Sequence, residues 1–443
     1  MITEKIENSL EPSSGSADMD KDVKVELIGY EEIDESNHRR CCILNVMAPR
    51  YLSKQVLAGF DKYKYSSVDN SPLSNYVTHP FWNWLVEFFP RWIAPNLLTF
   101  LGFMFLILHF VIVSIYDWDF YAASDTHPEY PPIPRWVWIV SSICIFVAHQ
   151  LDGIDGKQAR RTKSSTPLGE LFDHGLDSWA TTFFTLGLYS VFGRADYSVD
   201  VHRFFFVMVT VQATFIFSHW EKYNTGVLFL PWTYDLSQIA ITVVYFITFL
   251  GSYKIWKQNV PYIDLGYGYV FEFIMYSSFF LLSCPMTFYN LYKSYKEGTG
   301  YKRGFYEGMR PLFDNTIMLI LFCFWSWTSS NHILHACPRV FLVAMGTVFS
   351  NITSRLIIAQ MSQTRCETGN WLLYPLAALV ILQFFVKLSS SVENILLYAY
   401  CIIVLISHIH FGVGVVRQMA EHLEIDVFSL QRKPKQKKQV NSS

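Results

Sequence analysis

The segment from Asp152 to Trp179 has the sequence DGIDGKQARRTKSSTPLGELFDHGLDSW and contains two pairs of aspartates. These pairs are Asp152 with Asp155 and Asp173 with Asp177. Residues three or four positions apart share one face of a helix, so each pair would present both carboxylates on the same side. The intervening RTKSSTP breaks the helix, with Thr166 placed as an N-cap and Pro167 at the first helical position. The two helices are therefore predicted to form an antiparallel hairpin on which four carboxylates converge.

Four carboxylates next to hydrocarbon would be costly unless cations neutralised them. Carboxylate oxygens favour Mg²⁺, Mn²⁺ or Ca²⁺ over zinc, and four side chains are enough to bridge two ions. A pair of metal ions is suited to in-line displacement at phosphorus, because it stabilises both the entering and the leaving oxygen. The alternative is that the acids are helix caps or ion-pair partners of the basic residues that follow, Arg160, Arg161 and Lys163.

The rest of the chain is strongly apolar. Of its 443 residues 51% are hydrophobic and only 16% are charged, where about 25% is typical of a soluble domain. A membrane-spanning helix needs roughly 20 apolar residues. Ten segments are candidates: 94–117, 136–156, 175–193, 203–221, 234–251, 268–291, 311–328, 338–360, 371–388 and 394–415. The predicted fold is therefore all-α, a polytopic membrane bundle of about ten transmembrane helices. The net charge of −2 gives no reason to expect a nucleic-acid partner.

Lysine and arginine are concentrated in the loops after the second and sixth apolar segments and in the C-terminal tail, RKPKQKK. The loop after the first segment, DWDFYAASDTHPEYPPIP, is acidic instead. Because basic loops tend to stay on the cytosolic side, this pattern predicts that the four aspartates and both termini are cytosolic. The polar, acidic N-terminal residues do not resemble a cleavable signal peptide, so an internal apolar segment would direct membrane insertion.

The sequence divides into regions of different composition. Residues 1–46 are acidic, Ser-rich and poor in aromatics, as expected of a disordered extension. Residues 47–93 contain a short amphipathic stretch and the aromatic HPFWNWLVEFFPRW, which suits the headgroup layer of a bilayer. A connecting helix packed on the bundle is the alternative for this segment. A catalytic core at 94–228, further transmembrane helices at 229–418 and a basic cytosolic tail at 419–443 complete the prediction.

Small residues accompany the aspartates. Gly156, Ala159 and Gly169 lie beside them in the sequence, and small side chains let a ligand approach the backbone closely. Arg160 offers a guanidinium group to phosphate oxygens. Each of these residues alone would be ordinary helix packing. Together with the acids they predict a pocket for a nucleotide diphosphate.

The acids, the small residues and Arg160 match every fixed position of D-x₂-D-G-x₂-A-R-x₈-G-x₃-D-x₃-D, and in this pattern the chain resembles the CDP-alcohol phosphotransferase family. The resemblance implies a helical membrane core carrying two Mg²⁺ or Mn²⁺ ions. It also implies cleavage of a CDP-alcohol, with release of CMP and transfer of the phospho-alcohol to a lipid hydroxyl.

Within that family, the stretches LAGFDKYKYS, HPFWN and SHWEKYNTG resemble the eukaryotic ethanolaminephosphotransferases of the selenoprotein I type. This resemblance implies CDP-ethanolamine and diacylglycerol, or its alkyl analogue, as substrates. It further implies a homodimer in the endoplasmic reticulum or Golgi membrane. Residues 1–46 extend beyond the resembling region, and the C-terminal tail holds no selenocysteine.

The resemblance also implies roles for individual side chains. His174 would be the general base, and Glu170, one turn earlier on the same helix face, would contact its ring and raise its basicity. Asp177 is the alternative base. Asn96 would lie near the nucleotide phosphates, unless it is only a helix cap. His219 is a candidate substrate contact, with an ordinary interface position as the alternative.

Two other functions remain open at this point. CDP-choline could be the donor, alone or together with CDP-ethanolamine. A ten-span transporter is the alternative from a different class, but transporter sites lie near the bilayer midplane, whereas these acids are predicted at one membrane face.

Overall fold

The computed structural model describes residues 49–262 and 264–430. The predicted disordered extension at 1–46 and residues 431–443 of the predicted tail lie outside this part of the chain. Within the described residues the protein is an all-α bundle, whose only strands are β1 (Ser67–Val68) and β2 (Leu228–Phe229), paired in parallel. The predicted all-α polytopic bundle is confirmed.

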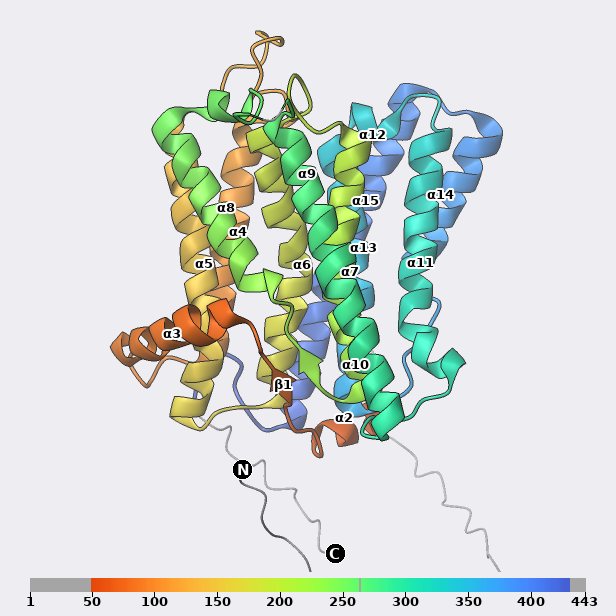
Figure 1. Ribbon diagram of the computed structural model, residues 1–443. Helices are drawn as coiled ribbons and strands as arrows, with labels where there is room; N and C mark the ends of the chain where they lie inside the picture. The colour runs from red at the N-terminus through yellow and green to blue at the C-terminus, as the bar shows by residue number, and fades with distance from the viewer. Residues whose placement is uncertain (1–48, 263, 431–443) are drawn as a thin grey trace, which may run out of the picture. The chain divides into compact units, whose positions relative to one another are not determined.

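Long helices run side by side along the bundle (Figure 1). In chain order they are α4 (Pro95–Tyr116), α5 (Arg135–Thr162), α6 (Pro167–Phe192), α7 (Val201–Thr225), α8 (Thr233–Gly251), α9 (Tyr267–Ser277) continued by η4 (Ser278–Ser283) and α10 (Cys284–Glu297), α11 (Phe305–Thr328), α13 (Pro338–Ser362), α14 (Leu373–Val386) and α15 (Ser390–His422). Shorter helices are α2 (Lys54–Phe60), η1 (Ser74–Thr78), α3 (His79–Leu85), η2 (Val86–Phe88), η3 (Tyr253–Trp256) and α12 (Ile333–Ala336).

Each of the ten predicted apolar segments coincides with one of the long helices. In the described part of the chain, seven are long and apolar enough to cross a membrane, namely α4, α5, α7, α8, the continuous α9–α10, α13 and α15. The other three are α6, α11 and α14, and α14 has only 14 residues. For α6, α11 and α14, membrane crossing therefore stays a prediction.

The predicted break between the two aspartate pairs is present. Lys163 adopts a left-handed conformation with φ of 57° and ends α5, and its N–H bonds back to carbonyls of the last turn. The Thr166 side chain accepts a hydrogen bond from the Gly169 N–H at 3.2 Å, and Pro167 follows at the first helical position of α6. The loop therefore reverses the chain within a few residues. The end of the bundle at which α5 finishes and α6 begins is called the motif end below.

The core is built around α13, whose side chains are nearly all buried. This helix packs closely on α6, and the absence of a side chain at Gly346 lets the two backbones lie close together. A Cβ atom at Gly346 would lie 2.0 Å from Thr182 Oγ1 on α6. The helix that carries two of the aspartates is thus held firmly against the most buried helix of the protein.

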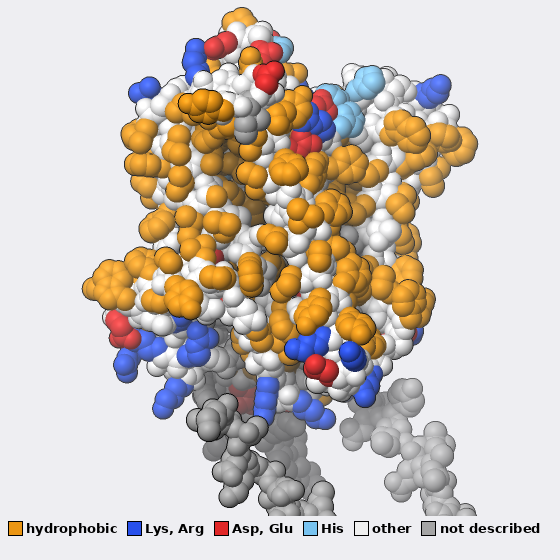
Figure 2. Space-filling view, in the orientation of Figure 1, with side chains coloured by type: hydrophobic (Ala, Val, Ile, Leu, Met, Phe, Trp, Pro, Cys, Tyr) orange, Lys and Arg blue, Asp and Glu red, His pale blue; other side chains and the backbone are white. Residues whose placement is uncertain are grey.

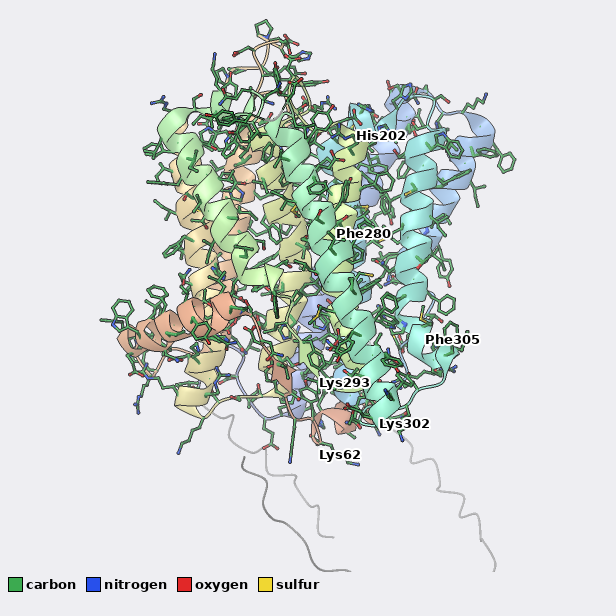
Figure 3. All side chains as sticks on the ribbon, viewed as in Figure 1. Lys62, His202, Phe280, Lys293, Lys302 and Phe305 are labelled. Carbon is green, nitrogen blue, oxygen red and sulfur yellow. The ribbon has the colours of Figure 1, made fainter. Side chains whose placement is uncertain are left out.

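The polarity of the surface changes along the bundle axis. Figure 2 shows hydrophobic side chains over the sides of the bundle and charged side chains towards its ends, as expected of a membrane protein. Figure 3 places Lys62, Lys293 and Lys302 at the motif end and His202 at the opposite end.

The aromatic segment before α4 forms η1, α3 and η2, which lie across the motif end instead of along the bundle (Figure 1). Its inner side packs on α5, because Trp82 fills the space above Gly153 and Arg161 Nη1 donates hydrogen bonds to the carbonyls of Val86 and Phe89 at 2.8 and 2.6 Å. Its outer side presents the exposed aromatic residues Tyr76, Trp84, Phe88 and Trp92. The segment is therefore packed on the bundle, as one of the two alternatives drawn from the sequence expected, and its place in the headgroup layer stays a prediction.

Candidate active site

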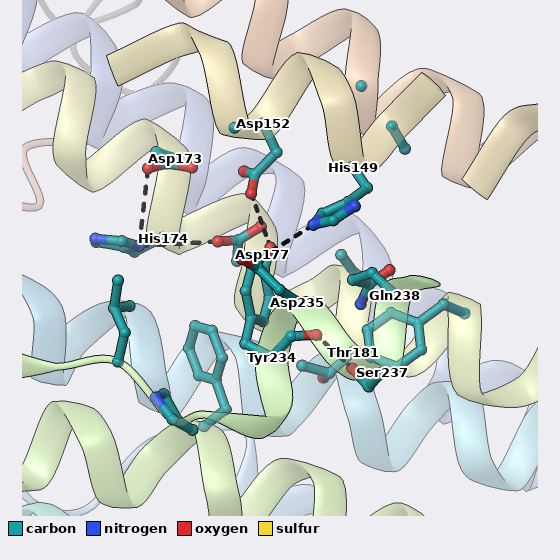
Figure 4. Close-up of a pocket in the computed structure, with 18 of the residues that line it drawn as sticks. His149, Asp152, Asp173, His174, Asp177, Thr181, Tyr234, Asp235, Ser237 and Gln238 are labelled. Carbon is teal, nitrogen blue, oxygen red and sulfur yellow. Dashed lines mark hydrogen bonds and ion pairs between the residues drawn. The ribbon is translucent and has the colours of Figure 1, made fainter. Parts of the chain in front are cut away.

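The α5–α6 hairpin brings the predicted carboxylates together at the motif end (Figure 4). Carboxylate oxygens of Asp152, Asp155 and Asp173 all lie within 4.8 Å of one another. A second group, formed by Asp173, His174 and Asp177, is equally close and shares Asp173 with the first. Two adjacent oxygen-rich groups with one bridging residue are an arrangement that could hold two divalent cations.

The alternative reading of the acids as ion-pair partners does not fit. Among the described residues, no lysine or arginine lies within ion-pair distance of the four aspartates. Arg161 is directed instead to Glu87 and to backbone carbonyls of the aromatic segment. Asp173 Oδ1 is buried and has no hydrogen-bond partner among these residues, so it is available to a cation. The residues present therefore fit a divalent metal.

Two hydroxyl groups from other helices hold the acids of α5. The Tyr234 hydroxyl on α8 donates a hydrogen bond to Asp152 Oδ2 at 2.8 Å, and the Thr99 hydroxyl on α4 donates to Asp155 Oδ2 at 2.5 Å. Hydrogen bonds of this kind orient the ligands of a metal and leave their second oxygens free. Sequence reasoning missed both residues, because nothing in their spacing connects them with the motif.

The residue after Tyr234 ties the aromatic segment to the site. Asp235 Oδ2 accepts hydrogen bonds from Ser74 at 2.7 Å and from Thr78 at 2.6 Å, while Asp235 Oδ1 lies 3.2 Å from His149 Nε2. His149 is on α5, one turn before Asp152 (Figure 4). The start of α8 therefore links the aromatic segment and α5 through one buried carboxylate, which the sequence did not reveal.

His174 lies beside the second acidic group. Its Nδ1 is 3.8 Å from both Asp173 Oδ2 and Asp177 Oδ2, and its Nε2 is buried without a hydrogen-bond partner among the described residues. The His219 ring lies 5.3 Å away between ring centroids, and its Nδ1 is 3.0 Å from Gln360 Nε2. Both histidines line the same cavity, so the structure brings His219 to the predicted site.

Glu170 differs from the prediction in its partners. Its Oε1 accepts hydrogen bonds from Lys222 Nζ, on the adjacent antiparallel α7, and from the Tyr63 hydroxyl at 2.7 Å. The expected contact with His174 is not among the hydrogen bonds or ion pairs of the described residues. The physical reason is that Glu170 forms a charge-assisted hydrogen bond with a lysine ammonium supplied by another helix, which is a strong partner for a carboxylate.

The predicted nucleotide-binding residues gather beside the acids. Asn96, Gly156, Ala159, Arg160 and Gly169 all line the cavity. A Cβ atom at Gly169 would lie 3.4 Å from Asn96 Oδ1, and one at Gly156 would meet only Arg160 Nη1, at 3.6 Å. The two glycines therefore keep the wall of the cavity open next to one amide and one guanidinium group.

The cavity itself has a volume of about 1060 Å³ and extends from the acids into the bundle. The polar part is formed by α4, α5 and the first half of α6. The inner part, between α6, α7, α8 and α9, is lined mainly by apolar side chains, including Phe184, Leu188, Phe215, Val244 and Phe271. A cavity with these two parts can take a charged group and a hydrocarbon chain at once.

Comparison with known proteins agrees with this chemistry. The family model described as CDP-alcohol phosphatidyltransferase matches residues 92–276. The chain is 48% identical to ethanolaminephosphotransferase 1 of Homo sapiens over 384 residues, which are 87% of this chain and 95% of that protein. It is 46% identical to the protein of the same name in Mus musculus, with the same coverage. It is also 28% identical to choline/ethanolaminephosphotransferase 1 of Arabidopsis thaliana, over 86% of this chain and 99% of that protein.

The match to these relatives covers the bundle as well as the motif, and the carboxylates that the motif predicts are close together in the structure. The chain belongs to the CDP-alcohol phosphatidyltransferase family.

Proposed function

We propose that this protein transfers phosphoethanolamine from CDP-ethanolamine to the hydroxyl group of diacylglycerol or an alkyl-acylglycerol. The products are phosphatidylethanolamine and CMP. The observation that carries the proposal is the pair of overlapping carboxylate groups at the polar end of a cavity whose other end is apolar. Ethanolamine is favoured as the headgroup because the relatives named for it are 48% and 46% identical, whereas a relative named for both choline and ethanolamine is 28% identical.

Asp152, Asp155, Asp173 and Asp177 would hold two Mg²⁺ or Mn²⁺ ions. When bound, such ions neutralise a diphosphate and stabilise the entering and leaving oxygens of a displacement at phosphorus. Tyr234 and Thr99 fix the carboxylates of α5 beforehand, so little reorganisation is needed when the substrate binds. Asn96 and Arg160 would bind phosphate oxygens, and the small side chains of Gly156, Ala159 and Gly169 leave room for the nucleotide.

His174 would take the proton of the lipid hydroxyl. The carboxylates of Asp173 and Asp177 lie 3.8 Å from Nδ1 and would favour an N–H there, and the buried Nε2, which has no hydrogen-bond partner among the described residues, would then accept the proton. The hydroxyl oxygen then attacks the phosphorus that bears ethanolamine, the bond from that phosphorus to CMP breaks, and CMP leaves with the bridging oxygen. Acyl or alkyl chains would occupy the apolar part of the cavity during this step.

The purified full-length protein is expected to release CMP from CDP-ethanolamine when diacylglycerol and Mg²⁺ are present, and to stop when a chelator is added. Mass spectrometry of the lipid product and measurement of CMP provide the test, with CDP-choline as the competing donor. Equal rates with the two donors would contradict the preference for ethanolamine. Failure to release CMP from either donor, with Mg²⁺ or Mn²⁺, would contradict the proposed function and favour a transport role.

His174→Ala is expected to lower kcat by at least about 100-fold, because general bases contribute roughly 10²–10⁴ to the rate. Binding of CDP-ethanolamine, measured by calorimetry, should persist. His202→Ala is the matched control, since His202 lies at the opposite end of the bundle, and its kcat should be unchanged. If His174→Ala keeps its activity, His174 is not the base and Asp177, the alternative, takes its place.

Asp155→Asn is expected to stabilise the protein when no metal is present, because it removes the buried member of a group of closely spaced carboxylates that repel one another. The melting temperature without metal should rise by about 2–4 °C, and the increase that Mg²⁺ causes in the parent protein should disappear. Thermal unfolding in detergent with and without Mg²⁺ measures both effects. Asp196→Asn, at an exposed position, serves as the control and should leave both values unchanged.

The protein is proposed to reside in the endoplasmic reticulum or Golgi membrane as a homodimer, with the motif end and both termini cytosolic. The native Cys337 and Cys366 are buried and do not report on sidedness. Lys293→Cys and Tyr262→Cys, made in a Cys41→Ser and Cys42→Ser background, are suitable because both positions are exposed. In sealed vesicles with the cytosolic face outward, an impermeant thiol reagent should label Lys293→Cys at once and Tyr262→Cys only after permeabilisation. Equal labelling of the two cysteines before permeabilisation would contradict the proposed orientation.

The molar mass of the purified protein in detergent tests the homodimer. A mass equal to that of one chain would contradict it.

A further inference from the structure

Lys222 has unusual surroundings for a lysine. Its side chain is 3% exposed, and it forms an ion pair with Glu170, whose side chain is 7% exposed. Its Nζ lies over two aromatic rings, 5.4 Å from the centroid of Tyr63 and 5.0 Å from that of Tyr65. Both tyrosines and Glu170 line the cavity, next to the residues that the chemistry requires.

Two tyrosine faces that converge on one point are a site for a cation. A trimethylammonium group has no N–H and is held best by such faces through cation–π contact. Here the space shared by the two rings is taken by the protein's own ammonium group. A quaternary headgroup would have to displace Lys222 or approach a like charge, and either outcome weakens its binding.

Glu170 offers a different kind of contact. Its Oε1 is engaged by Lys222 and Tyr63, but its Oε2 is buried and has no hydrogen-bond partner among the described residues. Burial and the nearby Glu170 carboxylate raise the pKa of the Tyr63 phenol above its ordinary value, so this hydroxyl keeps its proton and remains a donor to Oε1. A buried carboxylate oxygen without a donor is costly, and a primary ammonium supplies three N–H groups that can satisfy it.

The position of Glu170 suits a short amino alcohol. It precedes Asp173 by three residues on α6, which is about 5 Å along the helix axis. A phosphate bound to a divalent cation that Asp173 would hold would therefore have the ammonium of an attached ethanolamine within reach of Glu170. Glu170 would then lie between two ammonium groups, Lys222 at one oxygen and the ligand at the other.

We propose that Lys222, Tyr63, Tyr65 and Glu170 form a headgroup subsite that accepts a primary ammonium and excludes a quaternary one. The proposal rests on the proposed phosphotransferase function and assigns the donor preference to these four residues. Lys222 acts by filling the aromatic site, and Glu170 acts by accepting a hydrogen bond that only the primary ammonium can donate.

The test compares kcat/KM for CDP-ethanolamine and for CDP-choline, on the purified full-length protein with one diacylglycerol and saturating Mg²⁺. Lys222→Ala empties the aromatic site, so kcat/KM for CDP-choline should rise relative to that for CDP-ethanolamine by about tenfold or more. Lys64→Ala is the matched control. Lys64 lies between the two tyrosines in the sequence, and its side chain is exposed. Its replacement by alanine should leave the ratio of the two kcat/KM values unchanged.

Glu170→Gln is the second variant, and it tests the headgroup subsite even if Lys222→Ala does not fold. It keeps the shape of the side chain but removes its charge, so it should raise KM for CDP-ethanolamine more than KM for CDP-choline and lower the preference by about tenfold. A role of Glu170 in proton transfer would instead lower kcat for both donors by the same factor. An unchanged donor ratio in the folded variants overturns the headgroup subsite and leaves the phosphotransferase function intact. A parent protein without turnover of either donor overturns the proposed function itself.

Discussion

The constraint on which the structure depends is the mutual repulsion of carboxylates that its motif forces together. Three aspartates with oxygens within 4.8 Å of one another would, when all are ionised, repel by about 3 kcal/mol per pair at an effective dielectric constant of about 20. The summed repulsion of three such pairs is comparable to the whole free energy of unfolding of a typical domain, about 5–15 kcal/mol. Contacts from other helices hold the α5–α6 hairpin against this repulsion, and a divalent cation bound between the carboxylates would relieve it.

The helices around the hairpin supply that support through single polar contacts. Thr99 on α4 and Tyr234 on α8 each hold one carboxylate of α5, and Gly346 lets α13 press against the helix that carries the other two. Asp235 then joins α8 to α5 and to the aromatic segment at the same end. Asp235 contacts the aromatic segment, and its neighbour in the chain, Tyr234, contacts Asp152. A shift of the aromatic segment on the bundle would therefore also shift the hydroxyl group that orients Asp152.

Local rules predicted the hairpin well and failed for contacts between distant segments. Helical spacing predicted the two aspartate pairs, and the chemistry of Thr166 and Pro167 predicted the break between them. The resemblance to the family, which helical spacing permits, led to the expected contact of Glu170 with His174, and the structure shows Lys222 and Tyr63 as the partners of Glu170 instead. These partners lie 52 and 107 positions from Glu170, so only tertiary packing brings them there. Thr99 and Tyr234 could not be predicted for the same reason.

The residues proposed for the reaction and most of those proposed for headgroup choice lie in different parts of the chain. Groups suited to phosphoryl transfer are concentrated in one continuous stretch of α5 and α6, because metal ligands must converge within a few ångströms. Of the four residues of the headgroup subsite, Glu170 lies in that stretch, whereas Lys222 comes from α7 and Tyr63 and Tyr65 come from the loop after α2. A motif confined to α5 and α6 can therefore identify the reaction without identifying the alcohol. Donor choice can change through Lys222 and its aromatic neighbours while the geometry of the aspartates stays the same.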